Sequence, residues 1–153
     1  MTRAEIRLLA AEGYLRTGSV AQAAVLIDSS RVSKGGLPAL AGVITDASQV
    51  VPGGTACVPR VPDPAQNYQK TKCGNIWEAL KWEYRLETAY TGYGNWYFAG
   101  RGWGDLPEGT TVHRPIPYQE LQVRLEPFYA FGGTNQLGGA GKGHYGLFVG
   151  GAY

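Results

Sequence analysis

The chain has 153 residues, of which 44% are hydrophobic and only 17% are charged, with 23 glycines and 9 prolines. This length favours a single domain with a core of its own, and the glycine and proline content favours extensive loops. The net charge of +2 and the lack of a basic run give no reason to expect a nucleic-acid partner. No apolar stretch approaches the roughly 18 residues of a membrane span.

Two short helices are predicted near the N-terminus, over residues 3–16 and 20–32, because small and apolar residues recur at helical spacing. Ser19 is expected to cap the second helix. The residues expected to face inward are Ile6, Leu9, Ala10 and Gly13 in the first helix and Val20, Ala23, Ala24 and Ile27 in the second. Alanines at the crossing allow a close αα-hairpin, as in tetratricopeptide repeats. The amphipathic start is not a signal peptide, so any export signal is expected to lie outside this sequence.

Residues 39–73 are rich in glycine and proline and are predicted to form a long irregular loop. This loop contains both cysteines of the chain, Cys57 and Cys73. A disulfide between them is the preferred interpretation, and it would require an oxidising compartment. Two buried free thiols are an alternative. A zinc site with His113 and His144 is another, although the spacing fits no known zinc motif.

A longer third helix is predicted over residues 76–90, where Asn75 and Glu78 occupy the positions of a capping box. One face of this helix is expected to consist of Trp77, Leu80, Tyr84 and Thr88. The apolar surface is extended around it by Trp82, Leu86 and Tyr90. A helix that is apolar on several sides is normally packed between other elements.

A short fourth helix is predicted over residues 95–99, and a helical turn over residues 118–123 is expected to open at Pro117. The glycine-rich tail, residues 134–153, is expected to become ordered only against a partner. The predicted organisation is a helical region over residues 1–133, including the long loop 39–73, followed by this tail. The expected fold class is mostly α, a helical hairpin plus a long third helix with extensive Gly/Pro-rich loops.

Three segments resemble the C-terminal part of the RagB/SusD family of outer-membrane nutrient-binding lipoproteins. Residues 3–38 resemble the family's helical hairpin, with Asp28 where asparagine is usual. Residues 83–105 resemble its E-x-R-x-E-x-A…G…W…R-x-W-G signature, and residues 115–121, PIPYQEL, resemble its P-I-P-x-x-E-L segment. The three segments occur in the family's order.

The resemblance implies a tetratricopeptide-like helical fold and a non-enzymatic function. The chain would bind an oligosaccharide or a peptide at the extracellular face of the outer membrane, working with a TonB-dependent transporter. The lipid anchor of the family is expected to lie outside this sequence. A second hypothesis is a structural, self-assembling subunit that buries its aromatic surface against other copies, because large apolar patches seldom stay uncovered.

Four aromatic residues are the candidate ligand-binding residues, namely Tyr93, Trp96, Tyr97 and Trp103. Flat aromatic rings suit the apolar C–H faces of sugars, while the polar atoms of Tyr and Trp satisfy hydroxyl groups. The alternative interpretation is that these rings fill a core or an interface.

Glu83, Arg85 and Glu87 alternate along the third helix, so they do not face one another. We interpret them as structural, forming an ion-pair network that attaches the helix to neighbouring loops, with a ligand contact as the alternative. The glycine-rich residues 138–143 lack the pattern of a phosphate-binding loop, and no catalytic triad is legible. No catalytic residue, metal or cofactor is expected.

Overall fold

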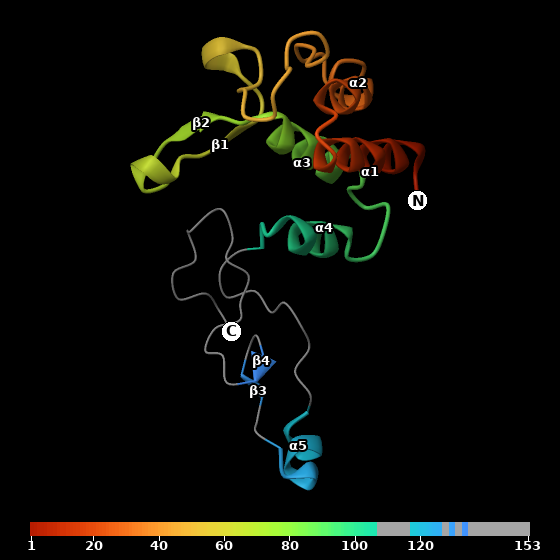
Figure 1. Cartoon of the computed structure of the whole chain (residues 1–153), viewed down its shortest axis with the longest axis vertical. Coiled ribbons are helices and arrows are strands. Elements are labelled where there is room, and N and C mark those ends of the chain that lie inside the picture. Colours follow the sequence, from red (N-terminus) through yellow and green to blue (C-terminus); the bar gives the residue numbers. More distant parts are fainter. Residues whose placement is uncertain (107–116, 127–128, 131–132, 135–153) are drawn as a thin grey trace. The chain divides into compact units, whose positions relative to one another are not determined.

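The computed structural model describes residues 1–106, 117–126, 129–130 and 133–134, and this part is mostly helical (Figure 1). The chain divides into two compact units. Unit 1 consists of Met1–Asp63 and Gln69–Tyr93, and unit 2 consists of Pro64–Tyr68 and Gly94–Tyr153. The predicted boundary between a helical region and a tail at residue 133 stays a prediction.

Unit 1 is built on three helices, α1 (Arg3–Arg16), α2 (Val20–Arg31) and α3 (Ile76–Glu87), and each packs against the other two (Figure 1). The core between them consists of buried side chains, which include Leu8, Ala11, Ala23, Ala24, Ile27, Ile76, Ala79 and Leu80. Alanines on all three helices allow the axes to lie close together. The predicted helical hairpin is therefore present, and α3 completes it as a third layer.

The predicted inward face of α1 is wrong. Ile6 is 56% exposed and Leu9 is 40% exposed, whereas the residues that are buried are Glu5, Leu8, Ala11 and Leu15. Small and apolar residues recur at helical spacing on both sides of this helix, so periodicity alone could not choose between the sides. A capping box between Thr2 and Glu5 begins the helix and places Glu5 on the side of the core.

The inward residues predicted for α2 are confirmed for Ala23, Ala24 and Ile27, which are fully buried. The side chain of Ser19 makes no capping bond, so this prediction is wrong.

α3 begins where expected, with the Asn75 side chain accepting a bond from the Glu78 amide, but it has only 12 residues and is not a long helix. It ends at Glu87 because the Thr88 hydroxyl bonds back to the Tyr84 carbonyl. Tyr90 then adopts a left-handed conformation with φ of 62°.

Residues 39–73 are not irregular throughout. Strands β1 (Arg60–Pro62) and β2 (Thr71–Cys73) form an antiparallel hairpin that pairs Arg60 with Cys73. Two short 3-10 helices, η1 (Gly54–Ala56) and η2 (Pro64–Gln66), flank β1. The predicted disulfide between Cys57 and Cys73 is confirmed, with the two Cα atoms 5.7 Å apart. Strands of three residues give too short a period to be read from sequence.

Unit 2 contains α4 (Asn95–Trp103), α5 (Tyr118–Arg124) and a small antiparallel pair of strands, β3 (Tyr129–Ala130) and β4 (Gly133–Thr134). The helix predicted over residues 95–99 thus continues for four more residues, through two glycines. The helix predicted over residues 118–123 is confirmed as α5. Most of the predicted tail, residues 135–153, lies outside the described residues.

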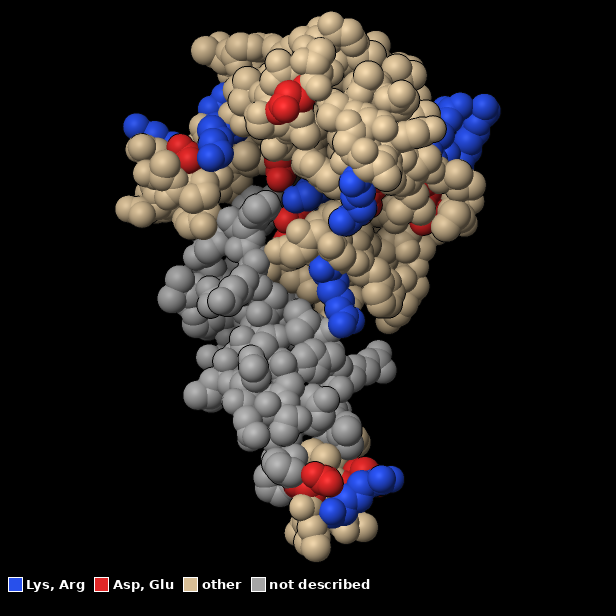
Figure 2. All heavy atoms as spheres, viewed as in Figure 1, with Lys and Arg blue, Asp and Glu red and all other residues tan. Residues whose placement is uncertain are grey.

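Among the described residues, no helix has both the length and the apolar composition needed to cross a lipid bilayer. Charged side chains of this part lie in small separate groups on the face shown in Figure 2, with wide uncharged areas between them. Most of this face therefore offers uncharged groups to a ligand.

Candidate functional site

The candidate aromatic site lies largely on α4. Trp96 and Trp103 are seven residues apart, which is close to two helical turns, so they lie on the same side of the helix about 10.5 Å apart along its axis. The Trp96 side chain is 57% exposed, and Trp103 is half-buried. One helix therefore presents two large rings in a row, with a spacing that is fixed by its backbone.

The C-terminal end of α4 is held by a Schellman motif. Gly104 has φ of 73°, and its amide bonds to the Arg101 carbonyl at 3.2 Å. The Asp105 amide bonds to the Gly100 carbonyl at 2.8 Å, which gives the hydrogen-bond pair of this motif. Leu106 then folds back onto Gly100 and is only 1% exposed. The turn fixes the end of the helix one residue after its second tryptophan ring.

The N-terminal end of α4 is held by a second glycine. Gly94 has φ of 77°, and a Cβ atom there would lie 2.9 Å from the ring of Phe98. The rings of Tyr97 and Phe98 meet edge to face with centroids 5.6 Å apart, and Phe98 is 64% exposed. Phe98 was missed as a candidate. Its spacing of four residues from a glycine was the available signal, because a glycine there leaves room for the ring.

The four predicted ligand-binding residues are not all in one unit. Trp96, Tyr97 and Trp103 share α4, whereas Tyr93 belongs to the end of unit 1, where it is fully exposed. The charged residue near the end of α4, Asp105, is only 4% exposed and is thus not presented on the surface. The three rings that share α4 are suited to stacking on a flat ligand.

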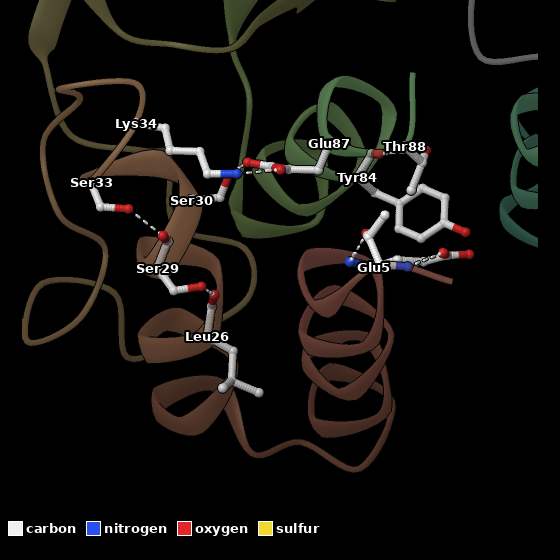
Figure 3. Close-up of polar contacts among 10 residues, drawn as sticks. Glu5, Leu26, Ser29, Ser30, Ser33, Lys34, Tyr84, Glu87 and Thr88 are labelled. Carbon is white, nitrogen blue, oxygen red and sulfur yellow. Dashed lines mark hydrogen bonds and ion pairs between the residues drawn. The ribbon is translucent and has the colours of Figure 1, made fainter. Parts of the chain in front are cut away.

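Glu87, the last residue of α3, faces the C-terminal end of α2 (Figure 3). Glu87 accepts a hydrogen bond from the Ser30 hydroxyl at 2.5 Å and pairs with Lys34 at 2.6 Å. Burial raises the pKa of Glu87, but the hydrogen bonds from Lys34 and Ser30 outweigh it and hold the pKa below its ordinary value. Glu87 therefore links α3 to the end of α2 and to the turn that follows.

Glu83 is more deeply buried in the same contact. Burial raises the pKa of Glu83, and a hydrogen bond with Ser30 and the positive charge of Arg31 only partly oppose this effect. Arg31 is fully buried, and its Nε donates to the Pro38 carbonyl at 2.9 Å. Burial also lowers the pKa of Arg31, against the nearby charges of Glu83 and Asp28. A buried arginine that senses the charges of Glu83 and Asp28 is a structural feature that the sequence did not reveal.

Glu5 completes the polar contacts between helices. The Tyr84 ring lies beside Glu5 at the start of α1 (Figure 3). Burial, followed by the negative charges of Glu5 and Glu12 and a hydrogen bond with Glu5, raises the pKa of Tyr84. Of the three alternating residues of α3, Glu83 and Glu87 thus contact α2, and Arg85 is half-buried on the same helix.

The disulfide removes both cysteines as zinc ligands, because only a thiolate binds the metal. His113 and His144 lie outside the described residues. Within the residues that are described, no group of three or more His, Cys, Asp or Glu side chains could hold a metal ion.

Comparison of the chain with protein-family models, with curated proteins and with solved structures finds no match in any of the three.

Proposed function

We propose that the chain is a non-enzymatic binding module that captures a sugar chain through the aromatic rings of α4. The observation that supports this proposal best is the pair Trp96 and Trp103 on one side of a helix whose two ends are both fixed by glycines. Because the helix backbone fixes the spacing of the two residues before a ligand arrives, less ordering of the chain is needed on binding.

The resemblance of three segments to the RagB/SusD family extends the proposal. The ligand would be an oligosaccharide, or alternatively a peptide, taken up at the extracellular face of the outer membrane. The partner would be a TonB-dependent transporter, on which the chain would act as a lid. The disulfide is compatible with this location, because such bonds persist outside the reducing cytosol.

Calorimetric titration with a panel of oligosaccharides tests the proposal. Trp96→Ala and Trp103→Ala should each weaken binding by about tenfold, because each removes a stacked ring. Trp82→Ala is the matched control, since this ring is also partly exposed, at 39%, but lies on α3. Equal affinity of all three variants and the parent chain would contradict the proposed site.

A self-assembling subunit is the second candidate, and it is favoured by the number of large apolar side chains on the surface. Within residues 82–98, the large exposed side chains are Trp82, Leu86, Tyr90, Tyr93, Trp96 and Phe98. Light scattering and negative-stain imaging of the purified chain would detect polymers. A strictly monomeric chain at high concentration would contradict this candidate.

A further inference from the structure

The outer side of α1 is an apolar stripe that the packing of unit 1 leaves uncovered. Ile6 is 56% exposed, Leu9 is 40% exposed, and Ala10 and Gly13 are also exposed. These four residues, called the outer stripe below, are spaced so that they share one side of the helix, opposite the buried Leu8. A helix with apolar residues on two sides is typical of one that is packed between two neighbours.

Arginines border the outer stripe on both edges. Arg3 and Arg7 are one turn apart along one edge, and within the described part of the chain neither forms an ion pair. Arg16 lies at the other edge, where it pairs with Glu12 at 2.6 Å. The remaining acid of α1, Glu5, is buried in the capping box. The uncovered side of α1 is therefore apolar in the middle, basic along the edge that carries Arg3 and Arg7, and without a free carboxylate.

We propose that the outer stripe is a docking surface for an amphipathic helix of a partner protein that has acidic residues beside its apolar side. Ala10 and Gly13 leave the middle of the stripe flat, so a second helix can approach closely. Carboxylates of the partner at a spacing of four residues would meet Arg3 and Arg7, which are spaced in the same way. Charge complementarity thus specifies the partner and its orientation.

Two other occupants fit less well. A lipid surface would require bulky apolar side chains to enter the acyl region, and the stripe has only Ile6 and Leu9. A second copy of this chain docked through the same stripe would offer Arg3 and Arg7 no free carboxylate, because Glu5 is buried and Glu12 pairs with Arg16. Both occupants are measurable alternatives in the experiment that follows.

The probe is a synthetic helical peptide with a Leu/Ala stripe flanked by glutamates, and its control has lysines in place of the glutamates. Fluorescence anisotropy with the full chain should show binding of the acidic peptide only, weakening as salt rises. The double variant Arg3→Glu/Arg7→Glu should weaken the acidic peptide by about tenfold and gain the basic one. Failure of the acidic peptide to bind, or an unchanged preference in the double variant, would overturn the proposal.

Two further variants keep the test independent of folding. Ile6→Glu should abolish binding while the circular dichroism spectrum stays unchanged, because this side chain is already mostly exposed. Val25→Glu, on an equally exposed apolar residue of α2, should bind the peptide normally. Binding to phosphatidylserine vesicles that is lost in Ile6→Glu, or a dimer that is lost in the same variant, would assign the stripe to a membrane or to a second copy instead.

Discussion

Replacing Glu87 with glutamine removes the charge that links α3 to the end of α2. The carboxylate accepts a bond from the buried Ser30 hydroxyl and pairs with Lys34, whose side chain is 63% exposed. A hydrogen bond to a charged group contributes about 1.5–3 kcal/mol, and an exposed ion pair contributes at most about 1 kcal/mol. Because glutamine keeps part of the hydrogen bonding, we expect Glu87→Gln to lower the free energy of unfolding by roughly 1–2 kcal/mol at pH 7.

The effect should depend on pH in a defined direction. The pKa of Glu87 is lowered in the folded state, so its charge stabilises the fold above the ordinary value of 4.5. This contribution is lost as the pH falls through the lowered pKa. Urea titrations at pH 7 and at progressively lower pH should therefore show the parent chain and Glu87→Gln converging in stability on acidification.

Glu83→Gln is the matched variant, one turn away on the same helix, and its expected result has the opposite sign. Because burial raises the pKa of Glu83, its ionisation destabilises the fold as the pH rises above 4.5. The neutral glutamine should therefore be tolerated at pH 7 and should flatten this part of the pH profile. A larger loss of stability in Glu83→Gln than in Glu87→Gln would refute the reasoning, because it would mean that attraction to Arg31 outweighs burial.

Three further changes test the packing. Leu8→Ala should lower the free energy of unfolding, measured in urea, by about 2–5 kcal/mol. Ile6→Ala, on the exposed side of the same helix, should change it by less than about 0.5 kcal/mol. Equal losses in the two variants would contradict the observation that Leu8, and not Ile6, faces the core. Gly104→Ala should lower helix content by circular dichroism because φ is +73° there, while Gly102→Ala, inside α4 with open space around it, should be neutral or stabilising. Reducing the disulfide should lower the free energy of unfolding by about 3 kcal/mol, and an unchanged urea midpoint would show that the hairpin is held by other contacts.

The sequence was most informative where a single strong signal decided the outcome. α1 has the predicted bounds, and the start of α3 follows from Asn75, whose amide side chain accepts the bond expected of an N-cap. The pairing of Cys57 with Cys73 follows from the count of two cysteines in one loop.

The sequence failed where two signals of similar strength competed. Both sides of α1 have helical periodicity, and only tertiary packing, in which Leu8 and Ala11 are buried, decides which side faces the core. The end of α3 depends on one hydroxyl, that of Thr88, and composition does not show where it bonds. The helical state of Gly100 and Gly102 contradicts their low intrinsic propensity, because the Schellman motif and Leu106 stabilise α4 from outside it.

The candidate site, too, could be predicted only in part from the sequence. An aromatic cluster could be located from sequence, but its division between two units depends on tertiary contacts. The polar contacts of Ser30, Arg31 and Lys34 with α3 were not predictable either, because Ser30 and Lys34 are each more than 50 residues away from Glu87 in the sequence.

The position of the disulfide has a consequence for the order in which unit 1 assembles. α3 reaches α1 and α2 only after the chain has passed through the whole β1–β2 hairpin, so the three-helix core requires closure of a long segment, which costs entropy and slows folding. A bond between Cys57 and Cys73 that forms early shortens the path from α2 to α3. Formation of this bond before the helices meet would thus speed up nucleation of the core as well as strengthen the finished fold.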